Sequence, residues 1–214
     1  MRRDLTASIA AALAFTVIFG IAYPLITTGV AQVLFPGKSD GSRIEREGET
    51  VGSSLIAQSF LTHEEIPEAE REEGGPKAIK APDPRYFQPR PSVTTYNPAG
   101  TGFSNLGPNN KELANRTAQL LENYLELEGP FTPELGEDDV PVDAVMTSGS
   151  SVDPHISIAN ARIQANRVAE VRGIPLDRVN DLIDENTDDR DFGLLGEPGV
   201  NVLELNLDLD EETT

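Results

Sequence analysis

The side chains with the clearest chemical potential lie between Thr147 and His155. Serine hydroxyls, the carboxylate of Asp153 and the imidazole of His155 are the three group types of a hydrolytic triad. Triad members converge from separate parts of a fold, whereas here the acid and the histidine share one turn beside the serines. No Gly-x-Ser-x-Gly elbow surrounds these serines. The pattern therefore favours a strand-to-helix turn, with Asp153 as the helix cap, over a hydrolase site.

Three further patterns each lack an essential member of the motif that they resemble. Residues 37–39 match the end of a phosphate-binding loop, but Gln32 stands where its first glycine is needed. Residues 184–188 carry carboxylate and amide side chains at alternate positions, as a calcium loop does, but Asp189 occupies the position of the turn glycine. The two histidines of the chain are too few for a helical zinc pair. We therefore predict no catalytic residue, no bound cofactor and no metal site.

The net charge of the chain limits the classes of molecule that it can bind. There are 36 acidic and 17 basic residues, which give a net charge of −19. Such a surface repels polyanions, so binding of nucleic acid is disfavoured. We interpret the acidity as an adaptation to a salty milieu, because dissolved ions screen the self-repulsion. The chain has no cysteine, which excludes disulfides and thiolate chemistry.

The chain that must position these groups begins with a long apolar segment. From Leu5 to Gly37 there is no charged side chain. A bilayer core needs about 20 helical residues, and the run from Ala7 to Phe35 exceeds that length. One alternative is a buried core helix, which rarely runs so long without charge. The other is a cleavable signal peptide, whose apolar region is usually shorter. We predict a transmembrane helix in the lipid bilayer of the cell membrane.

The orientation of this helix is not settled by counting charges, because basic residues lie on both sides of it. A short basic N-terminus is most simply kept in the cytoplasm. We therefore expect residues 1–6 to be cytoplasmic, residues 7–35 to form the transmembrane helix, and residues 36–214 to form one extracytoplasmic domain.

The sequence after the apolar segment predicts an α+β domain with few strands and long loops. A short strand is expected at 54–60, and a mobile, solvated acidic insertion at 62–84, whose few apolar residues cannot offset its ordering entropy. A second short strand is expected at 141–145. A third is expected at 203–209, where leucine alternates with polar residues.

Three helices are expected from their caps and apolar faces. Asn110 would cap the first helix. Asp153 and Pro154 would begin the second helix, which Gly173 would end. Pro175 would open the third. Because these helices and strands do not alternate as a βαβ series, the fold class is α+β rather than α/β.

Several motifs, none of them specific alone, follow one another over nearly the whole chain. They are YPLITT at 23–28, GSSLIAQ at 52–58, YFQPRPS at 86–92, SNL at 104–106, SGSSVDPHIS at 148–157, Gln164, Arg167-Val168 and VNVLELN at 200–206. In this series the chain resembles the C subunits of Kdp-type potassium-transporting ATPases, the KdpC family. It departs from the family pattern in the acidic stretch 62–83, and at Thr147 and Ser151, where alanine and glycine are usual.

The resemblance implies a non-catalytic accessory subunit of an ATP-driven, high-affinity potassium import complex. The implied partners are a channel-like potassium-selecting subunit, a P-type ATPase subunit and a small membrane subunit, and the complex handles ATP and potassium. The resemblance also implies two roles for this subunit: it stabilises assembly of the complex, and it acts as a catalytic chaperone that raises the ATP affinity of the ATPase subunit. Because ATP is cytoplasmic and most of this chain is expected outside, we favour assembly near the outer mouth of the channel-like subunit over direct ATP contact.

The apolar segment also shows features of a helix that packs on other membrane helices. Gly20 and Gly29 allow close approach, and a kink is expected at Pro24; a signal peptide would need neither. The expected partner-interface residues are Tyr23, Pro24, Thr27, Thr28, Arg90, Pro91, Ser92, Asn105, Asp153, Asn201 and Asn206. The alternative function is a membrane-anchored extracytoplasmic binding module unrelated to potassium transport.

Overall fold

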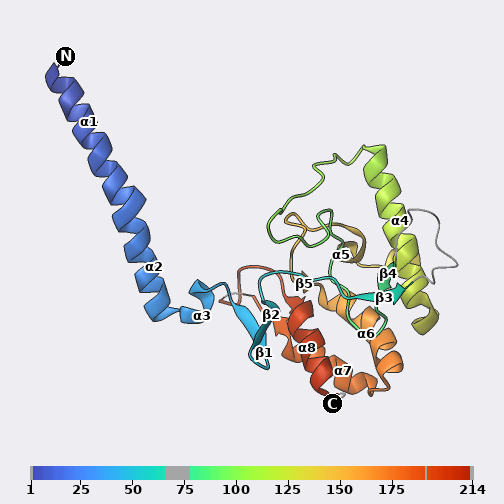
Figure 1. Cartoon of the computed structure of the whole chain (residues 1–214). Coiled ribbons are helices and arrows are strands. Elements are labelled where there is room, and N and C mark those ends of the chain that lie inside the picture. The colour runs from blue at the N-terminus through green and yellow to red at the C-terminus, as the bar shows by residue number, and fades with distance from the viewer. Residues whose placement is uncertain (1, 66–77, 191, 213–214) are drawn as a thin grey trace. The chain divides into compact units, whose positions relative to one another are not determined.

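The computed structural model describes residues 2–65, 78–190 and 192–212. The chain divides into two compact units, Met1–Ser53 and Ser54–Thr214. The first unit contains a long helical run and a small hairpin, and the second contains a second hairpin, a three-stranded sheet and the remaining helices (Figure 1). The predicted α+β class is therefore confirmed.

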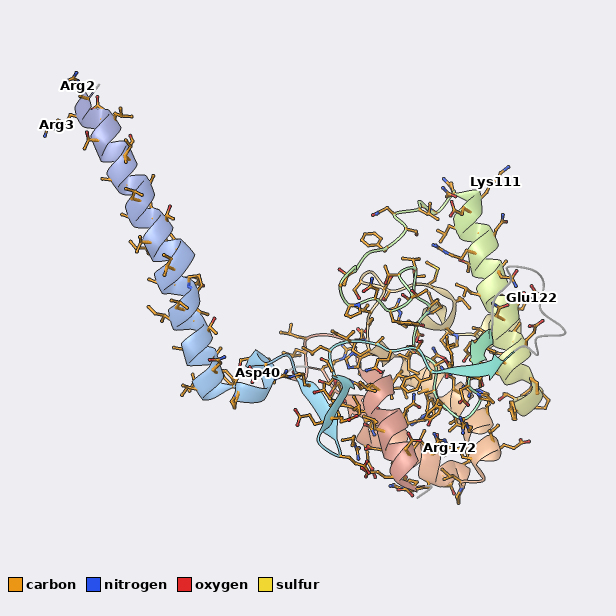
Figure 2. The ribbon with its side chains drawn as sticks, in the orientation of Figure 1. Arg2, Arg3, Asp40, Lys111, Glu122 and Arg172 are labelled. Carbon is orange, nitrogen blue, oxygen red and sulfur yellow. The ribbon has the colours of Figure 1, made fainter. Side chains whose placement is uncertain are left out.

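The first unit begins with a helical run of 33 residues, Arg2–Leu34, that is long and apolar enough to cross a membrane. It consists of α1 (Arg2–Val17), the π-helical turn η1 (Ile18–Ala22) and α2 (Tyr23–Leu34). None of its side chains is buried against the described part of the chain, which argues against a core helix. Arg2 and Arg3 lie at its N-terminal end (Figure 2).

The π-turn lies directly before Pro24. Proline has no N–H and cannot join the helical hydrogen-bond ladder, and a single wide turn is a common way to absorb such an interruption. The Tyr23 N–H accordingly donates to the Ile18 carbonyl, five residues back. The Thr27 hydroxyl donates to the Tyr23 carbonyl at 2.8 Å. The winding of the helix thus changes at Ile18–Ala22, just before Tyr23 and Pro24, and the kink expected at Pro24 stays a prediction.

A short helix and a hairpin complete the first unit. After α3 (Pro36–Ser39), strands β1 (Arg43–Arg46) and β2 (Glu49–Ser53) pair antiparallel. Glu47 and Gly48, between the strands, have φ of 52° and 84°. Two consecutive left-handed residues are what a tight two-residue hairpin turn requires.

The second unit does not contain the strand predicted at 54–60, because only Ile56 forms an isolated bridge there. A hairpin follows instead, in which β3 (Leu61–Glu65) pairs antiparallel with β4 (Ala78–Pro82). The two ends of the predicted acidic insertion 62–84 are therefore paired strands. Its middle, residues 66–77, lies outside the described residues, so its mobility stays a prediction.

Helix α4 (Lys111–Glu128) begins as predicted, because the Asn110 side chain accepts a hydrogen bond from the Glu112 N–H at 2.8 Å. The 3-10 turns η3 (Gly129–Phe131) and η4 (Glu137–Asp139) follow it. The strand predicted at 141–145 is wrong. The segment forms the short helix α5 (Val142–Val145) instead, in which the Ala144 N–H donates back to the Pro141 carbonyl. The Ala144 side chain is buried there.

Helix α6 (Ile158–Arg172) begins later than predicted. Its cap is Ser157, whose hydroxyl accepts from the Asn160 N–H at 3.1 Å, and not Asp153, because the intervening residues extend into a strand. Its predicted end is confirmed by Gly173, which adopts the left-handed conformation at φ 68°. Helix α7 (Leu176–Glu185) follows Pro175, as predicted.

The central sheet has the order β5-β7-β6, with both pairs antiparallel, and consists of β5 (His155–Ile156), β6 (Thr187–Asp188) and β7 (Gly199–Asn201). Gly199 is needed for its closeness to β5, because a Cβ atom there would lie 3.0 Å from the Cβ of His155. The close contact between β5 and β7 therefore lies at His155, whose imidazole is described below.

The strand predicted at 203–209 is wrong, because this segment forms helix α8 (Val202–Glu212). Leu205 and Leu209 are fully buried, whereas Leu207 is only half-buried, as helical periodicity requires. Asn201 begins this helix, since its side-chain oxygen accepts from the N–H groups of Leu203 and Glu204. Leucines spaced two residues apart fit a strand. The cap at Asn201 and the burial of Leu205 and Leu209, four residues apart, show that the segment is a helix.

The core of the second unit lies where α6, α7 and α8 pack around β5 and β7 (Figure 1). Its buried members are Phe87, Ile156, Ala161, Ala165, Val168, Ala169, Val179, Leu182, Ile183, Val200, Val202, Leu205 and Leu209. Phe87 comes from the extended segment after β4. The core thus binds an irregular segment to the helices as well as binding the helices to one another.

Leu205→Ala should lower the free energy of unfolding by about 2–5 kcal/mol, because it empties a fully buried site. Leu207→Ala should cost clearly less, because that side chain keeps contact with solvent. Urea titration of the detergent-solubilised chain, followed by circular dichroism, measures both. Equal losses would contradict the helix, since a strand places both leucines on one face.

Candidate interaction site

The polar centre of the second unit is a fully buried ion pair. The guanidinium of Arg167, on α6, donates from Nε to both carboxylate oxygens of Glu128, on α4, at 3.0 and 3.1 Å. Both side chains are 0% exposed. Burial raises the pKa of Glu128, and the adjacent guanidinium opposes that rise. The pair fastens the last turn of α4 to the middle of α6.

Arg167 also holds the segment that follows β4. Its Nη1 donates to the carbonyls of Pro84 and Tyr86, at 2.6 and 3.0 Å, and its Nη2 donates to Gln164 Oε1 at 3.1 Å. Arg172 assists from the same helix, donating from Nε to the Arg85 carbonyl at 2.6 Å. One helix therefore uses two arginines to fix the backbone of residues 84–86.

Two amide side chains then bind the backbone of the next two residues as a neighbouring strand would. The Phe87 N–H donates to Asn206 Oδ1 and the Phe87 carbonyl accepts from Asn206 Nδ2, both at 2.9 Å. In the same way Gln164 accepts from the Gln88 N–H at 2.7 Å and donates to the Gln88 carbonyl at 3.1 Å. This pairing satisfies the backbone groups of a buried, irregular segment. We call residues 84–88, held in this way, the clamped segment.

The hydrogen-bond network continues from Gln164 to α5. Gln164 Nε2 donates to Asn160 Oδ1, which also accepts from the Tyr124 hydroxyl at 2.9 Å. Asn160 Nδ2 donates in turn to the carboxylate of Asp143 at 3.0 Å. Burial raises the pKa of Tyr124, so its hydroxyl stays protonated and serves as a donor. Residues from three helices thus share one network.

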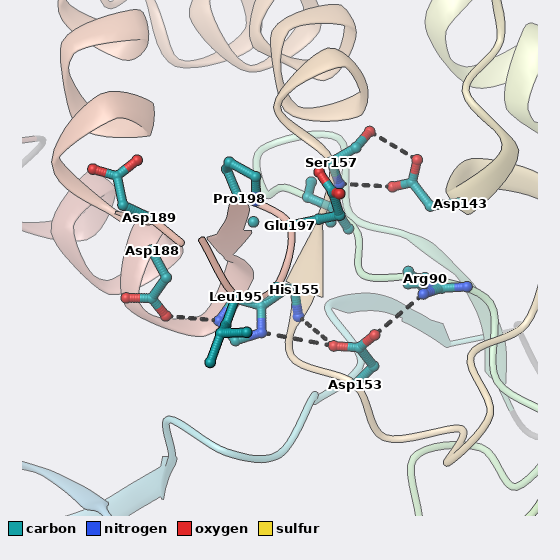
Figure 3. Close-up of a pocket in the computed structure, with 13 residues that line it drawn as sticks. Arg90, Asp143, Asp153, His155, Ser157, Asp188, Asp189, Leu195, Glu197 and Pro198 are labelled. Atoms are coloured by element: carbon teal, nitrogen blue, oxygen red, sulfur yellow. Dashed lines mark hydrogen bonds and ion pairs between the residues drawn. The ribbon is translucent and has the colours of Figure 1, made fainter. Parts of the chain in front are cut away.

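A hollow of about 390 Å³ lies at the edge of the sheet, lined by Arg90, Asp153, His155, Asp188 and the loop that precedes β7 (Figure 3). His155 Nε2 lies 2.9 Å from Asp188 Oδ2, and His155 Nδ1 lies 3.7 Å from Asp153 Oδ1. Arg90 Nη1 donates to the other oxygen of Asp153 at 3.2 Å. The four side chains form an alternating row of positive and negative groups.

The charges of this row shift the pKa values of its members. The carboxylate of Asp153 beside the ring raises the pKa of His155, burial partly opposes this, and the contact with Asp188 raises it further. Burial acts to raise the pKa of Asp153, but the hydrogen bonds from His155 and the nearby Arg90 guanidinium outweigh it and lower the pKa. The imidazole is therefore positioned as a cation between two carboxylates.

Of the expected interface residues in the second unit, the structure pairs Arg90 with Asp153, and on the apolar helix Thr27 bonds to the Tyr23 carbonyl. Ser92 accepts from the N–H groups of Thr94 and Tyr96, and Asn105 is an exposed residue at φ 54°. The remaining residues are Pro91 in the same loop as Ser92, Asn201 and Asn206 inside the second unit, and Tyr23, Pro24, Thr27 and Thr28 on the apolar helix.

Asn201 and Asn206 are only 2% and 1% exposed. Asn201 caps α8 and donates from Nδ2 to the Ser54 carbonyl at 2.9 Å, and Asn206 holds the clamped segment. Any effect of these two residues on a partner must therefore act through the fold. Sequence reasoning missed Glu128, Asn160 and Asp143, because each acts on a residue far away in the chain and has no local motif.

The motifs examined for chemistry have other uses in the structure. Ser151 is 1% exposed, and its hydroxyl donates to the Gly102 carbonyl. Its φ of 62° is left-handed, which explains why glycine suits this position. A Gly-x-Ser-x-Gly sequence does occur at 37–41, but its first three residues lie on α3, which follows a helix instead of the strand that a nucleophile elbow requires. The acids at 184 and 188 pair with Arg162 and His155.

Among the described residues, no group of three or more acidic or histidine side chains is arranged to hold a metal ion. Some of the polar side chains described above hold the domain's own backbone, and the others pair with one another. Fold and site together define a protein with one N-terminal helix able to cross a membrane and an α+β domain organised around a clamped segment.

A family model, KdpC, described as the c chain of the K+-transporting ATPase, matches residues 5–211. The chain therefore belongs to the KdpC family, and the resemblance seen in the motifs is confirmed.

Individual relatives match over nearly their whole length. The chain is 44% identical over 214 residues to the potassium-transporting ATPase KdpC subunit of Rhodospirillum rubrum, covering 99% of this chain and 97% of that protein. It is 43% identical over 211 residues to the KdpC subunit of Methylobacterium nodulans, with 99% and 98% covered. It is 41% identical over 212 residues to that of Mycobacterium bovis, with 98% and 99% covered.

Glu128→Leu should lower the free energy of unfolding by about 3–5 kcal/mol, because it leaves the buried Arg167 guanidinium without its counter-charge. Adding Arg167→Met should not restore stability, since the carbonyls of Pro84 and Tyr86 then lose their donor. Glu126→Leu, at an exposed position on the same helix, should change stability by no more than about 0.5 kcal/mol. Urea titration of the solubilised chain measures all three, and a loss at Glu128 as small as that at Glu126 would contradict a central role for the pair.

Asp188→Asn should reduce the pH dependence of stability. A raised histidine pKa stabilises the folded state below the unfolded value of about 6.5, and this contribution is lost as pH rises through the folded pKa. With one carboxylate removed, the pKa of His155 should fall, and the decline in unfolding free energy between pH 6 and pH 9 should shrink.

Titration of the His155 ring protons by NMR, with His155→Gln for assignment, checks the pKa directly. Asp184→Asn is the matched control, because Asp184 pairs with Arg162 and not with the imidazole. The lowered pKa of Asp153 affects stability only at acidic pH, outside this window. An unchanged His155 pKa in Asp188→Asn would show that the contact with Asp188 is absent in solution.

Proposed function

We propose that the chain is a non-catalytic accessory subunit of an ATP-driven, high-affinity potassium import complex. The match to the KdpC family over residues 5–211 carries this proposal. The partners proposed are a channel-like potassium-selecting subunit, a P-type ATPase subunit and a small membrane subunit. ATP and potassium are handled by the complex, and the C subunit stabilises its assembly.

The proposed topology is a single transmembrane helix with a cytoplasmic N-terminus and an extracytoplasmic domain. The uncharged length of the helical run supports the span, and the short basic N-terminus at Arg2 and Arg3 supports the orientation. A strongly acidic domain is also poorly suited to contact ATP, which is itself an anion. Any increase in the ATP affinity of the ATPase subunit is therefore transmitted through the assembled complex.

The transmembrane helix is proposed to be an interface as well as an anchor. The π-turn before Pro24 exposes a region of altered winding, and Gly29 leaves its side of the helix open, since no described residue lies within 4 Å of an added Cβ. Small residues of this kind let another membrane helix approach closely. Tyr23 and Thr27, four residues apart, share a face of α2 that is not the face of Gly29, and with Thr28 they are proposed to line a second helix contact.

The second unit contributes a pre-shaped surface. The buried pair of Arg167 and Glu128 and the two amide clamps fix residues 84–88, and the chain continues from there through Arg90, Pro91 and Ser92. A loop whose conformation is fixed in the free subunit loses little entropy on binding. This rigidity supports a role in assembly.

Affinity purification of the tagged chain from membranes that contain the co-expressed subunits tests the proposal. The unsubstituted chain should retain the other three subunits. Gly29→Leu should reduce their recovery several-fold by blocking helix approach, whereas Val30→Leu, a neighbouring apolar exchange, should not. A monodisperse chain that retains none of them would refute the proposal and favour a separate binding module.

A further inference from the structure

The loop between β6 and β7 exposes three large apolar side chains close together in sequence. Phe192 is 94% exposed, Leu194 is 81% exposed and Leu195 is 62% exposed. We call these three residues the apolar tip. Single exposed apolar residues are common on protein surfaces, but a group of large ones marks an interaction site or an aggregation liability. The KdpC family match does not say what this loop does.

An ion pair and a backbone hydrogen bond hold the described part of this loop, residues 189–190 and 192–198. Arg190 Nη2 and Glu197 Oε2 form an ion pair at 2.5 Å that joins the two ends of the loop. The Gly193 N–H donates to the Arg190 carbonyl at 2.9 Å. Phe192 itself has φ 54°, a left-handed conformation that is unfavourable for a bulky side chain. The loop thus holds an aromatic ring in solvent at a conformational cost, which suggests a use for the ring outside this chain.

The surroundings of the apolar tip are acidic. Asp188 and Glu197 have side chains that are 75% and 81% exposed, and Asp189 is exposed beside them. Leu195, Asp189 and Glu197 also line the hollow that contains His155 (Figure 3). The loop's one described basic residue, Arg190, already pairs with Glu197. The three carboxylates outnumber the two cationic groups that they face, Arg190 and the His155 imidazole, so the surroundings of the tip keep a net negative charge.

We infer that the apolar tip inserts into an apolar socket with a lysine- or arginine-rich rim, on another protein subunit of the complex. The inference rests on the proposed function and identifies the chemistry of one docking contact. Burial of aromatic and leucine side chains supplies the binding energy, and opposite charges at the rim supply orientation and a faster encounter. Insertion into an anionic lipid surface is disfavoured by the same carboxylates, and pairing of two copies would bring two negative rims together.

A photo-crosslinking amino acid at position 192 of the full chain, co-expressed with the other subunits, tests this inference. The expected product joins the chain to one of those subunits, at a peptide with apolar residues flanked by lysine or arginine. The same amino acid at Val142, which is 73% exposed on α5, is the matched control and should give little of this product. Products that contain lipid, a second copy of the chain or an acidic peptide would overturn the inference.

Substitutions supply a second measurement. Leu194→Ser with Leu195→Ser should weaken retention of the cross-linked subunit by at least about tenfold, as expected for hot-spot residues, whereas Val142→Ser should leave it unchanged. Glu197→Lys should weaken it at low salt more than at high salt. Circular dichroism of each variant checks that the domain remains folded.

The failure of the inference is distinguishable from that of the proposed function. If the unsubstituted chain retains the other subunits while the variants of the apolar tip retain them equally well, the inference is wrong and the accessory role stands. If the unsubstituted chain retains no subunit, the proposed function fails and the inference fails with it.

Discussion

The second unit depends on the buried guanidinium of Arg167. A buried cation is tolerated only when a counter-charge and hydrogen-bond acceptors surround it. Glu128 supplies the charge, and the carbonyls of Pro84 and Tyr86 supply further acceptors. These requirements bring α4, α6 and the clamped segment to one point. The ion pair therefore determines how α4, α6 and the clamped segment are arranged, as well as stabilising that arrangement.

The clamped segment shows how an irregular chain can be buried without a sheet. The N–H and carbonyl groups of Phe87 and Gln88 are paired with the side-chain amides of Asn206 and Gln164. An amide side chain carries one donor and one acceptor group side by side, so it can imitate a strand edge. This explains why polar residues occupy the centre of a small domain. The rigidity that results suits a subunit that acts by contact.

Much of the fold could be predicted where the cause was local. The caps at Asn110 and Gly173 and the buried face of α7 follow from side chains within a few residues of one another. The strand predicted at 203–209 failed because alternating leucines also satisfy part of a helical pattern. The start of α6 was misplaced because both Asp153 and Ser157 are good caps, and only pairing of β5 with β7 decides between them.

The sequence by itself determined the apolar helix, the acidic surface and the family, because length, charge and ordered motifs are properties of the chain alone. The tertiary structure alone decided how the polar residues are used. Glu128 meets Arg167, and Asp188 meets His155, across 39 and 33 residues of chain. No local pattern encodes such pairs, since they exist only after the helices and the sheet have packed. For the same reason, only the folded chain shows that Asn201 and Asn206 are buried and that Phe192 is not.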